Sequence, residues 1–147
     1  MSFLGKVKKK LRNGSWYPFY NTFYEKNNLD PHMILLESRS GKALESNILS
    51  LLKELCQEPY RSFTLVLSVH RDSENEIKEK LQKNSIQGVH FVRTGSVAYY
   101  RALSRAGYLV NDTSFPGRFI KKEGQIYLNT WHGTLLKRWD VTIVLRW

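Results

Sequence analysis

Short apolar runs alternate with amphipathic stretches along most of this chain, and this alternation restricts its fold more than any other feature. Apolar or β-branched runs predict strands at residues 33–37, 63–69, 89–92, 108–111 and 126–130. Helical spacing predicts helices at residues 44–56, 73–83 and 97–106, with Asp72 or Ser73 capping the second and Gly107 ending the third. We therefore expect a Rossmann-like α/β domain over residues 31–138, with a parallel sheet covered by helices on both faces.

The loops after the predicted strands are the expected ligand sites, because ligands bind beyond the carboxyl ends of parallel strands. Several of these loops carry groups that suit a phosphate, among them Arg93 and Ser96, although each of these residues also fits a plain solvated loop. Loop 38–42 (SRSGK) lacks the spacing of a P-loop, and no GxGxxG occurs, which excludes those nucleotide fingerprints. The four histidines lack metal-site spacing, so we expect no metal and no cofactor.

His132 stands out because it follows the last predicted strand and precedes Gly133 and Thr134 at the start of a short predicted helix. Gly133 allows a ligand to approach the backbone, and Thr134 caps the helix whose free N–H groups favour an anion. Lys137 follows about one turn later, within reach of a phosphate. A neutral imidazole there acts as a general base, whereas the alternative is a histidine with a purely structural role at a strand end.

The first 30 residues form a basic and aromatic segment that differs from the rest of the chain. Five cations stand before the first acidic residue of the chain: Lys6, Lys8, Lys9, Lys10 and Arg12. An aromatic cluster then begins at Trp16 and continues to residue 24. Apolar residues at helical spacing beside a basic face are typical of a helix lying on an anionic membrane. The alternative is a frayed basic helix followed by aromatic side chains packed on the domain.

The chain carries a formal net charge of +10, from 23 Lys and Arg against 13 Asp and Glu, which favours a polyanionic partner. No nucleic-acid-binding motif accompanies this charge, so we expect no nucleic acid. No secretory signal or spanning apolar run is found, so we expect a cytoplasmic protein.

Residues 111–137, NDTSFPGRFIKKEGQIYLNTWHGTLLK, resemble the CDP-glycerol:poly(glycerophosphate) glycerophosphotransferase family of bacterial wall teichoic acid synthesis. The TWHGT string is the most specific part, and ESRSGK at residues 37–42 and RTGSVAYY at residues 93–100 also look like the family. The resemblance covers residues 33–137, about two thirds of the chain.

The resemblance implies the N-terminal, acceptor-side domain of a GT-B architecture, in which two Rossmann-like domains face a cleft. It implies transfer of glycerol phosphate from CDP-glycerol to a membrane-linked polyol-phosphate acceptor, with release of CMP, on the cytoplasmic face of the membrane. His132 corresponds to the family's proposed base. We expect substrate-binding roles for seven residues: Gly133, Thr134, Lys137, Asn111, Ser114, Arg93 and Ser96.

The sequence departs from the family pattern in two places. Leu135 stands where the family has proline, and residues 139–147 diverge from it. Trp139-Asp140 replaces the family's Leu-Gly, as a one-base shift in reading frame would produce, so we hypothesise a frameshift or gene split that removed the second domain. We then expect a chain that is inactive alone; the alternative is a non-enzymatic module that binds a membrane surface or another polyanion.

Overall fold

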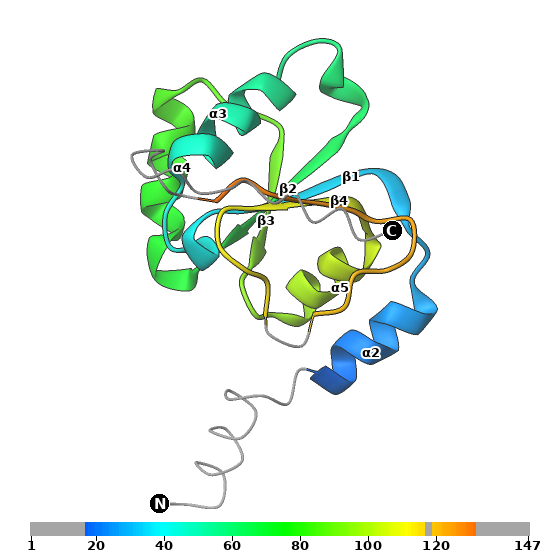
Figure 1. The fold of residues 1–147 in the computed structure, drawn as a ribbon. Coiled ribbons are helices and arrows are strands. Elements are labelled where there is room, and N and C mark those ends of the chain that lie inside the picture. The colour runs from blue at the N-terminus through cyan, green and yellow to red at the C-terminus, as the bar shows by residue number, and fades with distance from the viewer. Residues whose placement is uncertain (1–16, 117–118, 132–147) are drawn as a thin grey trace, which may run out of the picture.

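The computed structural model describes residues 17–116 and 119–131 and contains a five-stranded, all-parallel sheet (Figure 1). The strands are β1 (Asp30–Glu37), β2 (Thr64–Val69), β3 (Val89–Arg93), β4 (Ala106–Asn111) and β5 (Ile126–Asn129). They lie in the order β3-β2-β1-β4-β5. This is the order of the first five strands of a Rossmann fold, and it reverses direction between β1 and β4.

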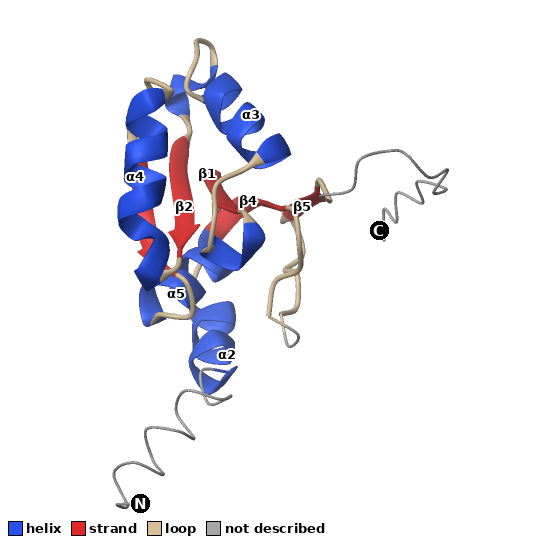
Figure 2. Cartoon of the chain, turned by 90° about the vertical axis from the view of Figure 1, so that its left-hand side faces the viewer, coloured by secondary structure: helices blue, strands red, loops and turns tan. Residues whose placement is uncertain are grey.

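Helices cover both faces of the sheet, as the alternating pattern predicts (Figures 1 and 2). One face carries α3 (Ser46–Leu55) and α4 (Glu74–Lys83), and the other carries α5 (Val97–Arg105) with α2 (Tyr17–Lys26) beside it. Short 3-10 turns join the elements at Arg39–Gly41, Tyr60–Ser62 and Arg71–Ser73. The predicted Rossmann-like α/β fold is therefore confirmed.

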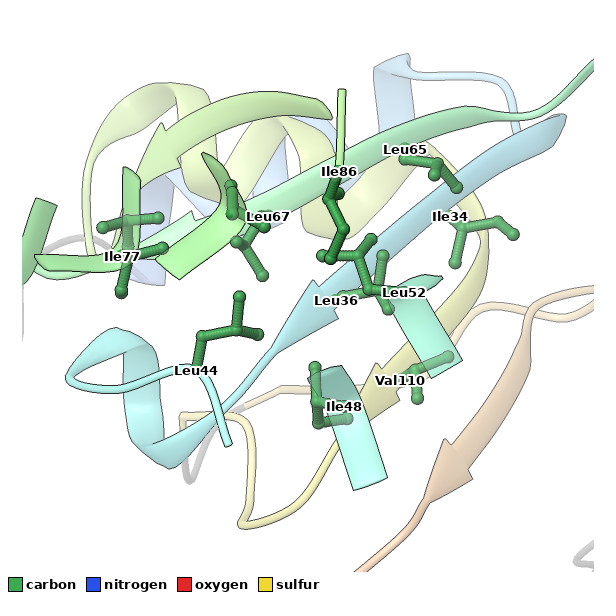
Figure 3. Packing of buried hydrophobic residues seen from close by; sticks show 12 residues of the cluster. Ile34, Leu36, Leu44, Ile48, Leu52, Leu65, Leu67, Ile77, Ile86 and Val110 are labelled. Carbon is green, nitrogen blue, oxygen red and sulfur yellow. The ribbon is translucent and has the colours of Figure 1, made fainter. Parts of the chain in front are cut away.

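Two hydrophobic clusters lie on opposite sides of the sheet. Beneath α3 and α4, Leu36, Ile48 and Ile77 pack with the other residues drawn in Figure 3. Beneath α5, Leu35 packs with Leu109 and Tyr99. Leu35 and Leu36 are consecutive and both 0% exposed, because successive side chains of a strand point to opposite faces. A central parallel strand must bury both faces, which explains its unbroken apolar run.

Gly107 does not end α5 as predicted. Strand β4 begins at Ala106, directly after the helix, and Gly107 lies within the strand. A Cβ at Gly107 would lie 2.8 Å from the carbonyl oxygen of Asp30 and 3.0 Å from Cα of Pro31. This glycine therefore permits β4 to approach the start of β1 closely.

The predicted cap of α4 is confirmed in position but lacks the expected side-chain hydrogen bond. Ser73 is the N-cap residue, but its side chain makes no capping hydrogen bond. The preceding 3-10 turn instead places Asp72 N near Nδ1 of His70, at 3.4 Å. The turn continues directly into the helix, so the hydrogen-bonded start of the helical segment lies earlier than the sequence pattern indicated.

Helix α2 belongs to the segment predicted to associate with a membrane, yet part of it packs on the domain. Tyr20 is 2% exposed, donates a hydrogen bond to the carbonyl of Ile120 at 2.7 Å, and contacts the ring of Tyr100. Phe23 lies beneath the guanidinium of Arg101, 5.3 Å away. These contacts match the alternative of aromatic residues packed on the domain; the basic residues Lys6, Lys8, Lys9, Lys10 and Arg12 and also Trp16 lie outside the described residues.

Candidate functional site

The carboxyl ends of four strands place polar side chains in one register, which we call the polar row: Ser68, Glu37, Asn111 and Asn129. Residues two positions earlier, Val66, Leu35 and Leu109, belong to the core beneath α5. Side chains two residues apart share a face of a strand, so the polar row lies on the α5 side of the sheet. It crosses the point between β1 and β4 where sheets of this order bind ligands.

Glu37 is the acidic member of the polar row, with 1% of its surface exposed. Burial raises the pKa of its carboxyl group, the hydroxyls of Ser68 and Tyr99 act in the lowering direction, and the charge of Asp112 raises it further. Neither Glu37 Oε2 nor Tyr99 Oη makes a hydrogen bond of ordinary geometry within the described part of the chain. Glu37 is therefore a buried acid with unused hydrogen-bonding capacity at the centre of the site.

Asp112 fixes the loop that follows β1. Its carboxylate accepts hydrogen bonds from Ser38 Oγ and from the backbone N–H of Arg39, each at 2.8 Å. Arg39 and Ser40 have φ values of 48° and 55°, in the left-handed region that non-glycine residues rarely adopt. Their conformation needs support from neighbouring groups, and Asp112 provides it across 73 residues of sequence.

Gly41 closes the same loop against the neighbouring strands. Its φ is 78°, its carbonyl accepts from His70 N at 2.6 Å, and an added Cβ would overlap Thr94 Oγ1. The glycine of SRSGK therefore serves close packing between loops.

The structure brings only some of the predicted substrate-binding residues together. Asn111 is fully buried, and its Oδ1 accepts a hydrogen bond from Tyr127 Oη at 2.9 Å, while its Nδ2 has no partner among the described residues. Ser114 lies exposed in the loop after β4. Asn111 and Ser114 therefore share one end of the sheet.

Arg93 and Ser96 occupy different surroundings. Arg93 ends β3, three strands from β4, so by strand spacing it lies roughly 14 Å from Asn111. Ser96 is the N-cap of α5, and its Oγ accepts from Tyr99 N at 3.2 Å. Ser96 therefore has a structural partner, and it orients the helix that carries Tyr99 to the polar row.

His132, Gly133, Thr134 and Lys137 lie outside the described residues, but the chain that leads to them is described. Thr130 N donates to the carbonyl of Asn111 at 2.8 Å, so this segment continues the β4–β5 pairing. Trp131 N donates to Oδ1 of Asn129 at 2.9 Å. Thr130 and Trp131, the two residues before His132, thus lie beside the polar row.

Glu37, Asp112 and Asn47 are the site residues that sequence reasoning missed. One signal was available for Glu37, since an acid directly after Leu35-Leu36 occupies a position where the strand is still buried. Asp112 and Asn47 act through contacts 73 to 84 residues away in sequence, which no local pattern reveals.

The described residues include no group of three or more His, Cys, Asp or Glu able to hold a metal ion. Nor do they include a helix with the length and apolar character needed to cross a membrane.

Comparison with known families matches residues 19–144 to the CDP-Glycerol:Poly(glycerophosphate) glycerophosphotransferase family. The teichoic acid poly(glycerol phosphate) polymerase of Staphylococcus epidermidis is 31% identical over 119 residues, covering 81% of this chain and 15% of that protein. The protein of the same name from Bacillus subtilis is 27% identical over 140 residues, covering 92% of this chain and 18% of that protein. The chain thus spans less than a fifth of the length of these two relatives.

Solved structures of the wall teichoic acid polymerase TagF share the fold. One matches 99% of this chain and 36% of its own with a TM-score of 0.62 and 26% identity. A variant soaked with CDPG matches 94% of this chain and 34% of its own, again with a TM-score of 0.62 and 26% identity.

Proposed function

The chain belongs to the CDP-Glycerol:Poly(glycerophosphate) glycerophosphotransferase family, and on that premise we propose that it forms the N-terminal, acceptor-side part of a glycerophosphotransferase. The reaction transfers glycerol phosphate from CDP-glycerol to a membrane-linked teichoic acid acceptor and releases CMP. The observation that carries the proposal is the position of TWHGT: its first two residues, Thr130 and Trp131, lie at the carboxyl end of β5 beside the polar row.

His132 is the proposed general base. Its neutral imidazole takes the proton from the acceptor's terminal hydroxyl as that oxygen forms a bond to the β-phosphorus of CDP-glycerol. The bond from this phosphorus to the bridging oxygen breaks, and CMP leaves with the electron pair. Such base catalysis typically contributes about 10²–10⁴-fold to a rate.

Charge stabilisation of the transferred phosphate is assigned to the residues after His132. Gly133 and Thr134 offer backbone N–H groups and a hydroxyl, and Lys137 offers a cation. Ser114, exposed in the loop after β4, is suited to join them. The buried carboxyl groups of Glu37 and Asp112 disfavour a phosphate within the polar row itself, so we place the phosphate outside it.

The experiment is a chimera, because the chain covers only 15% of the Staphylococcus epidermidis relative. Residues 19–144 replace the matching segment of that enzyme, and release of CMP from CDP-glycerol is measured with a teichoic acid acceptor. We expect turnover, and a loss of at least about 100-fold in a chimera carrying His132→Ala. A chimera that folds and binds CDP-glycerol but releases no CMP contradicts the proposal.

The net charge of +10 favours a second candidate function, binding at an anionic membrane surface on the cytoplasmic side. Co-sedimentation with vesicles of anionic or neutral lipid, with and without residues 1–16, tests it. We expect binding to anionic vesicles that the deletion weakens. Equal binding to both lipids, or no effect of the deletion, contradicts a role for Lys6, Lys8, Lys9, Lys10, Arg12 and Trp16.

A further inference from the structure

The two residues before His132 are held by a side chain from a distant part of the chain. Asn47, in the first turn of α3, donates from Nδ2 to the carbonyl of Thr130 at 3.1 Å and to that of Trp131 at 3.3 Å. These are the last two carbonyl groups before His132. One amide therefore joins the start of α3 to the chain at the point where it enters the TWHGT motif.

Other contacts hold the same residues from the opposite direction. Asn129 accepts from Trp131 N through Oδ1, and its Nδ2 donates to the carbonyl of Thr113 at 2.6 Å. Thr130 N donates to the carbonyl of Asn111 at 2.8 Å. The backbone N–H groups of these residues are thus satisfied by β4 and β5, and their carbonyls accept from Asn47 of α3.

Trp131 has a backbone conformation that needs such support. Its φ is 50°, in the left-handed region that non-glycine residues rarely adopt. Trp131 as a whole is 64% exposed. Its N–H donates to Asn129 Oδ1 and its carbonyl accepts from Asn47 Nδ2, and these two hydrogen bonds support the turn.

Asn47 itself stands on a rigid base. The next residue, Ile48, is 0% exposed in the core beneath α3, and the loop before the helix is fixed by Asp112. The side chain of Asn47 is exposed, so its loss removes few packing contacts. Its contacts therefore serve the direction of residues 130–131 more than the stability of the fold.

We propose that Asn47 is a positioning residue for His132, acting through the carbonyl groups of Thr130 and Trp131. This inference rests on the proposed function for its catalytic meaning. Misplacement of a catalytic group by about 1 Å can reduce a rate by about 100-fold, so a clamp next to the base affects turnover without touching the substrate.

The first test measures hydrogen–deuterium exchange in the 147-residue chain. Asn47→Ala removes the amide, and Asn47→Asp keeps its size but replaces the donor by a carboxylate facing two carbonyl oxygens. Asn84→Ala is the matched control, because Asn84 Nδ2 donates to the carbonyl of Lys80 at 2.7 Å, at the end of α4. We expect exchange of the backbone amides of Thr130 and Trp131 to be about tenfold faster than in wild type in both Asn47 variants, and unchanged in the control. Unchanged exchange overturns the proposal.

The second test measures steady-state CMP release in the chimera described above. We expect kcat to fall about 10- to 100-fold in Asn47→Ala and Asn47→Asp, with little change in KM for CDP-glycerol, and Asn47→Gln to recover part of the loss. Exchange that accelerates while kcat stays at the wild-type value overturns the positioning role. Absence of turnover in the unsubstituted chimera counts against the proposed function, and the exchange experiment then decides on the clamp by itself.

Discussion

The two faces of the sheet share one backbone but differ at the carboxyl ends of the strands. Towards α3 and α4 the face stays apolar to the end, with Val69 and Val110 buried in the core. Towards α5 the face turns from apolar to polar between residues two positions apart, from Leu35 to Glu37 and from Leu109 to Asn111. Tyr99 of α5 covers this change with a phenol rather than an aliphatic side chain.

This difference shows how a fold built for stability accommodates a site. Side chains alternate between faces along each strand, so polar residues at alternate terminal positions modify one face and leave the other intact. The strand residues directly beneath the polar row, Leu35, Val66 and Leu109, are aliphatic like the strand residues of the opposite face. Chemistry is thereby confined to the last position of each strand on one side, next to the segment that carries TWHGT.

The largest expected effect tests the apolar layer that the two faces share. Leu35→Ala and Leu36→Ala each delete a fully buried leucine side chain, one beneath α5 and one beneath α3. We expect each to lower the free energy of unfolding by about 2–5 kcal/mol, because lost burial and a cavity act together. Urea denaturation measures both. A cost below about 1 kcal/mol on the α5 side alone would show that this face is loosely packed and that the comparison is wrong.

Removal of the Asn111 side chain tests the polar row. Asn111→Ala leaves the hydroxyl of Tyr127 without its partner at 2.9 Å, and we expect a cost of about 1–3 kcal/mol. A double-mutant cycle with Tyr127→Phe isolates the pair, with an expected coupling of about 1 kcal/mol. Additive single-variant costs would mean that the hydrogen bond does not connect β4 to β5.

The sequence predicted the sheet well because its signal is local. Runs such as Leu35-Leu36 can be buried on both sides only inside a parallel sheet, and amphipathic helices between them leave few other topologies. Strand β1 still starts three residues earlier than the apolar run predicts, because the strand includes Pro31 and proline is tolerated near the start of a strand. A glycine after a helical pattern predicts a helix end. The close approach of Gly107 to Asp30 depends on tertiary packing, which the local pattern does not reveal.

The site was predicted less completely because its contacts are long-range. The TWHGT string is visible in sequence, but the contacts that hold it come from Asn47 and Asn111, 83 and 19 residues before Thr130. Asn111 was predicted to bind substrate, and the structure gives its Oδ1 a hydrogen-bond donor in Tyr127. Local patterns report which residues are polar, and only the fold reports which of them face one another.

A smaller effect is expected from the charge of Glu37. Burial raises the pKa of its carboxyl group above the unfolded value, so the folded state binds the proton more tightly. Stability is then greatest below the unfolded pKa of about 4.5 and falls as the pH rises towards the folded pKa. Glu37→Gln removes this loss, so the variant gains stability relative to wild type as the pH rises from 4 to 8. Thermal unfolding across that range measures the difference, and a gap that is constant or shrinks with pH contradicts a raised pKa for the Glu37 carboxyl group.

The smallest effect is expected at β5, where the apolar face continues without a cover among the described residues. Leu128 pairs in register with Val110 on the α3 side of the sheet, but it is 50% exposed whereas Val110 is 6% exposed. Leu128→Thr should therefore change the free energy of unfolding by no more than about 0.5 kcal/mol, while Val110→Thr buries a hydroxyl and should cost about 1–3 kcal/mol.

Urea denaturation of both variants, at protein concentrations spanning a hundredfold, completes this comparison. If Leu128→Thr is as costly as Val110→Thr and its cost grows with concentration, a second molecule covers β5 in solution, because burial that depends on association is lost on dilution. If the two costs differ as expected at every concentration, Leu128 is exposed to solvent in solution and no second molecule covers β5. The apolar pattern of residues 126–128 is then set by strand pairing with β4 and not by a buried face of its own.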